Sequence, residues 1–383
     1  MQHLFSGRWS IIERLKGIDW LLVIPIITIA CLGLVTMNSF TGENPFFNRQ
    51  LIWLCVGTLF MIGASVGDYR FLRRTSVVVT LYVGMLFTLL ALFLVGSVFQ
   101  GAQSWFNLGF FAVQPSDPAK LIVIMVLAKY FSRRHVAIAN IRHIIVSGIY
   151  AFLIFLLVFL QPDFGSAIII GSIWFGMVLV SGISKKHLLL VGIIALTAGV
   201  GLWVGVFEQY QKDRIVSFLN PLADIQGTGY NAYQSTIAVG SGTLLGKGVG
   251  YGTQSRLKFL PEYETDFIFA AYAEEWGFVG IVFLLGLFAI VFVRLMVHAI
   301  HGASNFETLF IAGVASMLLA HITIHVGMNV GLLPVTGTTL PFMSYGGSHL
   351  ITEFFAIGMI LAMRKYAHIA HKGDVDREVV GVQ

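Results

Sequence analysis

The chain has 383 residues, of which 57% are hydrophobic and only 11% are charged, and its mean hydropathy is +0.83. This composition excludes a soluble globular domain and is typical of a helical protein that crosses a membrane many times. The pI near 9.2 is explained by basic residues that anchor such a protein at the membrane surface, and it requires no nucleic-acid partner.

Ten hydrophobic segments are candidates to cross a bilayer, which takes about 20 apolar residues. They are expected at 18–38, 50–67, 76–99, 118–132, 143–160, 165–183, 187–206, 266–293, 306–328 and 348–363. Lys and Arg concentrate in alternate connections, which by the positive-inside rule places both termini in the cytoplasm. We therefore expect an all-α polytopic membrane protein, a single domain over 1–383, with a large extracytoplasmic loop, 207–265, between the seventh and eighth spans.

The N-terminal segment and the two cysteines give little further information about fold or function. Met1–Gly17 is basic and lacks the small-residue cleavage site of a signal peptide, so the first span is expected to remain as an anchor. Cys31 and Cys55 both fall inside spans, so they indicate neither a disulfide framework nor a metal site.

Two short stretches on the predicted outer side carry acidic residues. Asp117 and Lys120 begin the fourth span three residues apart, so they share a helix face and are expected to form a structural ion pair. Before them, Trp105 fits an interfacial anchor. Asp163 lies between Pro162 and Gly165, where the helix must break, and it is either a turn or cap residue or an outward-facing functional carboxylate.

The outer segment 207–265 is too long for a simple connection, and loops of this length are usually functional or disordered. Its five basic residues lie on the side that the positive-inside rule depletes, which suggests an anionic partner such as a diphosphate: Lys212, Arg214, Lys247, Arg256 and Lys258. The glycine run 240–252 is either a flexible loop or a source of backbone N–H groups for phosphate, although it lacks P-loop spacing.

The stretch 259–277 carries acidic residues directly into an apolar run. It predicts a helix that begins with Thr265 or Asp266 as N-cap and continues to about Leu295. Asp266 would then lie at the membrane boundary, where an ionisable group is a candidate functional site. The helix dipole is expected to keep Asp266 ionised, as suits a general base. Cap and catalyst remain equally good interpretations of this residue.

Other polar residues near the last spans are given packing roles. Glu274 and Glu275 do not share the helix face of Asp266, if one helix carries all three. His321 and His325 have i, i+4 spacing but no third ligand, so they predict polar packing or a pore lining rather than a metal site. The uncharged segment 329–348, rich in Pro and Gly, predicts irregular backbone that lines a cavity.

Taken together, these blocks resemble the SEDS family of polytopic membrane glycosyltransferases, named for shape, elongation, division and sporulation, and most closely its rod-shape members. The resemblance covers nearly the whole chain. It rests on Gly101-Ala-Gln…Trp105…Gln114-Pro-Ser, Gln161-Pro-Asp163-Phe-Gly, Arg214…Asn220-Pro221, Gly229-Tyr…Gln234-Ser, Phe259-Leu-Pro-Glu…Thr-Asp266-Phe-Ile-Phe and Gly331-Leu-Leu-Pro-Val-Thr-Gly…Leu-Pro-Phe…Ser344-Tyr-Gly-Gly-Ser.

The resemblance implies a peptidoglycan glycosyltransferase that polymerises lipid II during cell-wall elongation, with inversion, at the outer face of the inner membrane. It implies Asp266 as the catalytic base and the release of undecaprenyl diphosphate. Supporting positions would be Asp163, Asp117, Lys120, Trp105, Gln114, Arg214, Lys247, Arg256, Lys258, Glu262 and Ser344. The expected partners are a class B penicillin-binding protein, the nascent glycan and membrane proteins of the elongation complex; Mg or Mn is a possible cofactor, and no organic cofactor is expected.

The sequence departs from the family pattern at three positions. The family usually has Arg where Ser104 stands, Asp where Asn107 stands, and Glu where Asp117 stands. The shorter Asp117 side chain is expected to weaken the pairing with Lys120. Two alternatives to a polymerase remain open: a flippase or transporter for the same lipid, since broken helices and carboxylates also mark transport pathways, and a non-catalytic scaffold for the transpeptidase.

Overall fold

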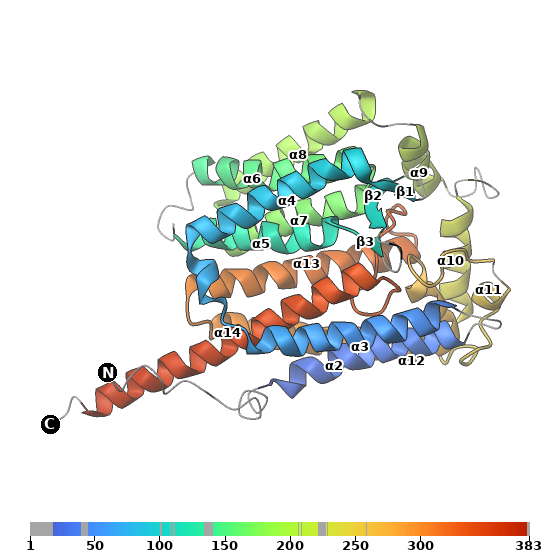
Figure 1. Ribbon diagram of the computed structural model, residues 1–383. Coiled ribbons are helices and arrows are strands. Elements are labelled where there is room, and N and C mark those ends of the chain that lie inside the picture. Colours follow the sequence, from blue (N-terminus) through green and yellow to red (C-terminus); the bar gives the residue numbers. More distant parts are fainter. Residues whose placement is uncertain are drawn as a thin grey trace.

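A computed structural model describes residues 18–39, 45–99, 102–107, 109, 112–133, 141–205, 207, 209–220, 227, 229–257 and 259–380. Long helices run up and down through one bundle (Figure 1). They are α2 (Trp20–Asn38), α3 (Pro45–Val66), α4 (Thr75–Val95), α5 (Ser116–Ser132), α6 (Ile141–Leu160), α7 (Phe164–Val180), α8 (Lys185–Gly205), α12 (Ile268–Ile300), α13 (Asn305–Asn329) and α14 (Gly347–Val380).

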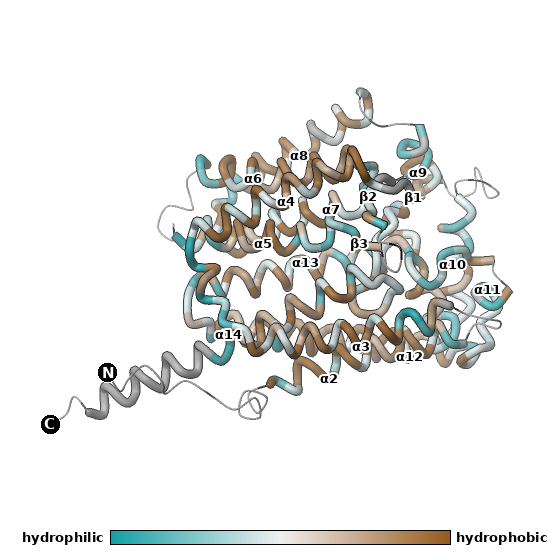
Figure 2. The backbone as a smooth tube through the Cα atoms, viewed as in Figure 1, coloured by the Kyte–Doolittle hydropathy of each residue, from teal (hydrophilic) through white to brown (hydrophobic). Residues whose placement is uncertain are grey.

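Each expected hydrophobic segment coincides with one of these helices. Within the described residues, seven helices are long and apolar enough to cross a membrane: α2, α3, α4, α6, α8, α12 and α13. Apolar residues follow the lengths of the helices, and hydrophilic residues gather towards their ends (Figure 2). A helix satisfies all its backbone polar groups internally, which lipid requires. The chain is therefore a multi-pass membrane protein, as the composition predicts.

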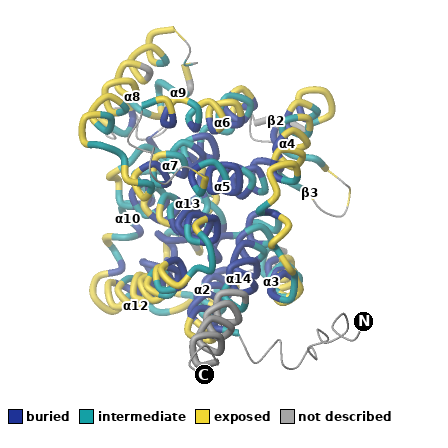
Figure 3. The backbone as a smooth tube through the Cα atoms, turned by 90° about the vertical axis from the view of Figure 1, so that its left-hand side faces the viewer, coloured by how far each residue is buried: buried dark blue, intermediate teal, exposed yellow. Residues whose placement is uncertain are grey.

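Helix α13 lies at the centre of the bundle and contacts α5, α7, α12 and α14 (Figure 3). In its apolar window 72% of the residues are buried, whereas α8 has none buried and lies at the rim. The central helices accordingly supply most of the core, and α8 presents an apolar surface on nearly every side.

The bundle has one end rich in connecting structure, here termed the loop end. It carries the short helices α9 (Gln209–Leu219), α10 (Tyr230–Ser241) and α11 (Thr253–Arg256), which lie beside the ends of the long helices (Figure 1). About half of the described residues of 207–265 are thus helical. The other end includes the 3-10 helix η1 (Tyr69–Arg73).

A small antiparallel sheet also lies at the loop end, and the all-α expectation did not include it. Strands β1 (Ser97–Phe99), β2 (Ala102–Asn107) and β3 (Ala112–Val113) pair in that order. Trp105 faces Ser97 in the register, and Phe106 faces Val113. The sheet connects α4 to α5, so it fixes how the chain enters the start of α5.

A buried acidic residue joins three helices at the opposite end. Asp19 caps α2 by accepting a hydrogen bond from Leu21 N at 3.2 Å. Its other oxygen lies 2.6 Å from Arg294 Nη2 and 2.7 Å from His298 Nε2, both on α12. Arg364 on α14 lies 3.8 Å away. These contacts compensate the burial of the carboxylate.

Candidate functional site

Asp266 lies in a turn that precedes α12, not at its cap. Residues 261–267 form consecutive turns, in which Thr265 N and Phe267 N both donate to Glu262 O at 3.2 and 3.1 Å. The helix begins at Ile268 with Phe267 as N-cap and no side-chain cap bond. The N-cap prediction for Thr265 or Asp266 was therefore wrong, because this turn delays the helix.

Side chains from α13 and from the segment before α14 form hydrogen bonds with the backbone around Asp266. Asn329 Nδ2 donates to Asp266 O at 3.0 Å, while Asn329 Oδ1 accepts from Ala270 N at 3.1 Å. Ser344 Oγ donates to Thr265 O at 2.8 Å and accepts from Leu340 N at 2.8 Å. These bonds fix the position of the turn. The sequence indicated Ser344 as a supporting residue, and its contact is with this backbone.

The Asp266 side chain faces the segment 336–338. Gly337 has a φ of +73°, and a Cβ added there would lie 3.6 Å from Asp266 Oδ2. The same segment packs on α7, since a Cβ at Gly165 would approach Thr336 O to 2.8 Å. The structure thus brings Asp163, which precedes Gly165, and Asp266 to the two sides of one irregular segment, as the cavity-lining prediction for 329–348 suggests.

Asp163 is a cap residue that also accepts other bonds. Its Oδ1 accepts from Ser166 N at 3.0 Å and so caps α7. Its Oδ2 accepts from Gln114 Nε2 at 2.8 Å and from Ser116 Oγ at 3.1 Å. The cap prediction for Asp163 is confirmed, and Gln114 acts by joining the start of α5 to the start of α7.

The environment of Asp266 changes its acidity. Burial raises the pKa of Asp266 to about 7, and the negative charges of Glu262 and Glu264 act in the same direction, whereas the positive charge of Arg214 lowers it. We expected the helix dipole to keep this carboxylate ionised, but the helix begins later and desolvation dominates. A pKa near 7 nevertheless suits a general base at neutral pH.

Asp117 and Lys120 form the predicted ion pair deep in the bundle. Lys120 Nζ lies 3.0 Å from Asp117 Oδ1, and both side chains are nearly inaccessible to solvent. The shorter Asp117 side chain still makes this contact, and it also lies 3.3 Å from His349 Nδ1 on α14. His349 Nε2 is 2.9 Å from Glu353 Oε1. The pair therefore belongs to a larger buried cluster, because α14 returns past the start of α5.

The histidines of α13 hold the backbone of the irregular segment. His321 Nδ1 lies 3.2 Å from Thr339 O, and His325 Nδ1 lies 2.7 Å from Thr338 O. From α14, Glu353 Oε2 accepts from Phe342 N at 2.8 Å. The packing prediction for the histidines is confirmed. Sequence reasoning missed His349 and Glu353, since no local motif distinguishes them from other polar residues of a span.

Helix α12 is broken at Gly277, and the glycine run packs against the break. Gly277 has φ +65° and ψ −166°, so the helix consists of two parts and continues to Ile300, beyond the predicted end. Phe278 N and Val279 N donate to Thr243 O and Leu244 O at 2.9 and 3.1 Å. A Cβ on Gly246 would lie 2.1 Å from Glu275 O. Glycine is required here for close backbone contact, and this run serves neither as a phosphate loop nor as a flexible one.

Two buried carboxylates secure the loop that follows this run. Glu274 accepts from Lys247 Nζ at 2.7 Å and from Thr253 N at 2.8 Å. Glu275 accepts from Gly250 N at 2.9 Å and also from Ser39 Oγ at the end of α2. Both have the predicted packing role, although the reason given from a helical wheel fails because Asp266 precedes the helix. Lys247, expected to bind phosphate, is instead paired with Glu274.

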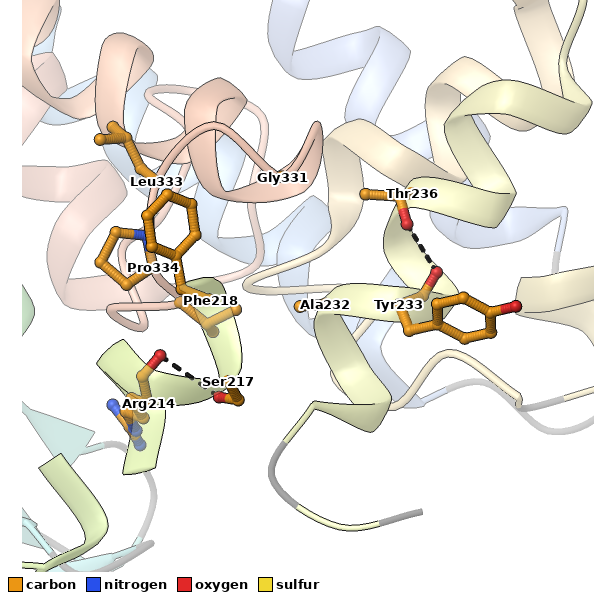
Figure 4. A pocket seen from close by; sticks show the side chains of 10 residues that line it. Arg214, Ser217, Phe218, Ala232, Tyr233, Thr236, Gly331, Leu333 and Pro334 are labelled. Atoms are coloured by element: carbon orange, nitrogen blue, oxygen red, sulfur yellow. Dashed lines mark hydrogen bonds between the residues drawn. The ribbon is translucent and has the colours of Figure 1, made fainter. Parts of the chain in front are cut away.

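A small groove, with a cavity volume of about 50 Å³, lies between α9, α10 and the segment after α13 (Figure 4). It is lined by Arg214, Ser217, Phe218, Ala232, Tyr233, Thr236, Gly331, Leu333, Pro334 and Val335. Ser217 Oγ donates to Arg214 O at 3.3 Å and Thr236 Oγ1 donates to Tyr233 O at 2.8 Å. Because these hydroxyls serve their own helices, the walls are mainly apolar, and Arg214 contributes the positive charge.

The remaining predicted residues lie apart from Asp266 or on its rim. Trp105 is half-buried in β2, Arg256 is exposed on α11, and Lys258 lies outside the described residues. Glu262 is exposed, with a φ of +52°, and accepts from Thr265 Oγ1 at 3.1 Å. At the positions that depart from the family pattern, Ser104 is buried and Asn107 Oδ1 accepts from Gly109 N at 3.0 Å.

A metal site made by the protein alone is not found in the described part of the chain, where no three His, Cys, Asp or Glu side chains gather suitably. Mg²⁺ is commonly held by one or two carboxylates together with substrate phosphates. Asp266 and the exposed Glu262 could contribute carboxylates of this kind, so the residues suit a cation brought with substrate rather than a resident one.

Comparisons with known proteins agree with this geometry. Residues 15–369 match the FtsW/RodA/SpoVE family of cell cycle proteins. The stage V sporulation protein E of Bacillus subtilis is 36% identical over 361 residues, covering 91% of this chain and 97% of that protein. The peptidoglycan glycosyltransferase MrdB of Escherichia coli is 36% identical over 293 residues, covering 76% and 79%.

Solved structures with the same fold include a chain of a peptidoglycan synthase complex that coordinates polymerization and crosslinking. It aligns with a TM-score of 0.77 and 31% identity, covering 91% of this chain and 98% of that chain. The rod shape determining protein RodA of Thermus thermophilus aligns with a TM-score of 0.67 and 30% identity, covering 91% and 96%.

Proposed function

The chain belongs to the FtsW/RodA/SpoVE family, the SEDS proteins, and from that premise we propose that it is a peptidoglycan glycosyltransferase which polymerises lipid II with Asp266 as general base. The observation that carries this assignment is the environment of the Asp266 carboxylate. In the described part of the chain, no group donates a hydrogen bond to the Asp266 side chain, and burial raises its pKa to about 7. A group in this condition can accept a proton at neutral pH.

The reaction follows from this placement. Asp266 takes the proton from the acceptor 4-hydroxyl while that oxygen attacks the anomeric carbon of the donor. The bond from that carbon to the diphosphate oxygen breaks, and the diphosphate leaves with the electron pair. Direct displacement inverts the configuration, so one carboxylate suffices and no glycosyl-enzyme forms.

The segment 336–338 and its supports orient this base. Gly337 lies beside the Asp266 carboxylate, and Thr338 O is bonded to His325. Asp163 caps α7, whose Gly165 packs closely on the segment at Thr336 O. We assign Asn329 and Ser344 positioning roles, since their side chains hold backbone around Asp266. Asp163 has a supporting role, because it joins the start of α5 to the start of α7.

The assignment is tested by Asp266→Asn. The amide keeps the size of the side chain but cannot accept the proton, so purified protein should lose glycan synthesis from lipid II by at least about 10²-fold. Expression, thermal stability and partner binding should persist. A partly buried acid elsewhere at the loop end provides the matched control, Asp213→Asn, which should retain activity. Wild-type rates in the Asp266 variant would refute the role.

The same assay separates a polymerase from a transporter. Lipid II in detergent offers no membrane to cross, so a flippase would produce no polymer, whereas a polymerase would extend glycan strands of increasing length. A scaffold would also be inactive without its partner. The polymer is resolved by gel electrophoresis after labelling of the stem peptide.

The proposed partner is a class B penicillin-binding protein, supported by the structural match to a synthase complex that couples polymerization with crosslinking. Other elongation-complex membrane proteins are proposed on family grounds. We place the loop end, with Asp266, on the outer face of the inner membrane and both termini in the cytoplasm, as the distribution of Lys and Arg favours.

A divalent cation, Mg or Mn, is proposed to act only with bound substrate. Its chemistry would be charge neutralisation on the departing diphosphate. Chelation should then slow polymerisation without lowering the thermal stability of the substrate-free protein. A large loss of stability on chelation would instead indicate a resident structural ion.

A further inference from the structure

The groove beside α9 has the chemistry of a site for an amphiphilic anion. Its walls are apolar or aromatic, from Phe218, Tyr233, Leu333, Pro334 and Val335, and the Arg214 guanidinium lies on the α9 wall (Figure 4). We propose that this groove holds the prenyl diphosphate end of the sugar donor, with Arg214 on the phosphates and the apolar walls on the first isoprene units. This inference rests on the proposed function and names the site of its leaving group.

The groove lies next to the base without including it. Val335 packs with Phe267 in a small hydrophobic cluster, and Phe267 directly follows Asp266. Leu333, Pro334 and Val335 line the groove, while Gly337, two residues later, lies beside the Asp266 carboxylate. Inverting displacement requires the attacking hydroxyl, which the base deprotonates, and the leaving group on opposite sides of the reacting carbon. The groove and the base lie at neighbouring positions of one continuous segment.

The positive charge of Arg214 acts both in the groove and at the Asp266 carboxylate. It lowers the pKa of Asp266, although burial dominates and raises that pKa overall. The same positive charge therefore stabilises negative charge near the reacting atoms. As the bond to the sugar breaks, the electron pair passes to a diphosphate oxygen, and a guanidinium can donate two hydrogen bonds to such an anion.

The apolar walls favour a prenyl chain over a glycan. A polysaccharide requires many hydrogen-bond partners, whereas the Ser217 and Thr236 hydroxyls that border the groove donate to their own helices. An isoprene unit requires only apolar contact and gains about 25 cal/mol for each Å² removed from water.

Among the described basic residues of the loop end, Arg214 is the one that lines the groove. Lys247 is bonded to Glu274 and Thr253, at 2.7 and 2.9 Å. Arg256 does not line the groove. Lys212 lies two positions before Arg214 on α9, about 200° around the helix, so it points away from the groove wall and provides a matched control.

The test measures ligand binding to the full chain carrying Asp266→Asn, which prevents turnover, in nanodiscs of zwitterionic lipid. The probe is radiolabelled farnesyl diphosphate in equilibrium dialysis, compared with farnesol and with inorganic diphosphate. Arg214→Gln should raise the Kd for farnesyl diphosphate about tenfold or more, as expected for loss of a charged hydrogen bond. Phe218→Ala should raise it about fivefold through lost apolar contact.

Lys212→Gln should leave the Kd within about twofold, because Lys212 does not line the groove. Equal effects of Arg214→Gln and Lys212→Gln would overturn the proposal. Farnesol binding as tightly as farnesyl diphosphate would do so too, and so would inorganic diphosphate binding equally well. Circular dichroism and thermal unfolding confirm that each variant is folded.

The binding result is independent of polymerisation. If the protein binds farnesyl diphosphate through Arg214 but the wild-type chain makes no glycan, the assignment of the groove stands and the assignment as a polymerase is refuted. If the wild-type chain makes glycan but binding does not depend on Arg214, the assignment as a polymerase stands and the assignment of the groove is refuted.

Discussion

Among the acidic residues that surround the site, Asp266 differs by the absence of any donor to its carboxylate in the described residues. Asp163 accepts from Gln114 and Ser166, and Glu274 accepts from Lys247. Bonded carboxylates of this kind hold backbone or side chains in place. Asp266 has lost water without gaining such bonds, so its affinity for a proton increases.

The pH dependence of catalysis should report this carboxylate. The base works when deprotonated, so kcat should fall as the pH drops through about 7, far above the ordinary value of 3.8. Glu262→Gln removes a negative charge that raises this pKa and should shift the midpoint to lower pH. Arg214→Gln should shift it to higher pH. Identical midpoints in all three proteins would show that another group controls the profile.

The buried pair of Asp117 and Lys120 should be sensitive to removal of one partner. Lys120→Met leaves the Asp117 carboxylate buried with only His349 beside it, a change that typically destabilises by about 3–5 kcal/mol. The measurement is thermal or SDS-induced unfolding in detergent. Lys185→Met, at an exposed position on α8, should have little effect on the midpoint. Equal midpoints for the two variants would refute a structural pair.

At the scale of elements, the broken helix α12 determines how the outer segment meets the bundle. Its first part follows Asp266 directly, and its second part continues to Ile300. The break exposes backbone groups at 278 and 279, which the carbonyls of Thr243 and Leu244 satisfy. The loop and the base are thus parts of one packed unit, because a free N–H buried here would be unfavourable.

Gly277→Ala should disrupt this unit. A Cβ there would lie 2.2 Å from Gly246 N, and the positive φ adds strain of about 1–3 kcal/mol. We expect a lower unfolding midpoint and lower activity. Gly286→Ala, on the same helix with open space around it, should be neutral or stabilising by about 0.5–1 kcal/mol. A harmless Gly277→Ala would mean that the break is not required.

Glu274→Gln should loosen the loop without unfolding the bundle. The amide loses charge-assisted bonds to Lys247 and to Thr253 N, which are typically worth about 1.5–3 kcal/mol each. Trypsin should then cleave after Arg256 about tenfold faster, since cleavage follows the open population. Asp213→Asn on α9 is the acid-to-amide control and should leave the cleavage rate unchanged.

At the scale of the whole molecule, hydrophilic residues gather towards the two ends of the bundle (Figure 2). A buried polar cluster also lies within the bundle, around the ion pair of Asp117 and Lys120. That cluster joins α5, α13 and α14 through Asp117, His321 and His349. Its members support the segment beside Asp266, so catalytic geometry depends on how these three helices pack.

The proposed orientation in the membrane can be measured directly. With Cys31 and Cys55 replaced by serine, Tyr251→Cys places an exposed thiol at the loop end and Lys185→Cys places one at the opposite end. In intact cells an impermeant maleimide should label only Tyr251→Cys. Labelling of only Lys185→Cys would reverse the topology and leave the base in the wrong compartment for its substrate.

Local sequence pattern was sufficient to predict contacts between close neighbours in the chain, but not contacts between distant segments. The pairing of Asp117 with Lys120 and the capping by Asp163 depend on neighbours within three residues, so spacing predicted both. The start of α12 was predicted too early, because the turn at 261–267 is held by Ser344 and Asn329 from distant segments. Lys247 was assigned to phosphate since its partner Glu274 is 27 residues away.

By itself, the sequence determined a bundle of membrane-spanning helices, the family resemblance and the acidic residue at the head of the eighth span, because hydrophobic length and short motifs are local properties. Only the tertiary structure decided that this residue has no donor among the described residues, that the glycine run fills the break in α12, and that Arg214 lines an apolar groove. Desolvation and long-range hydrogen bonds depend on what packs around a group, and that arrangement exists only once the helices have come together.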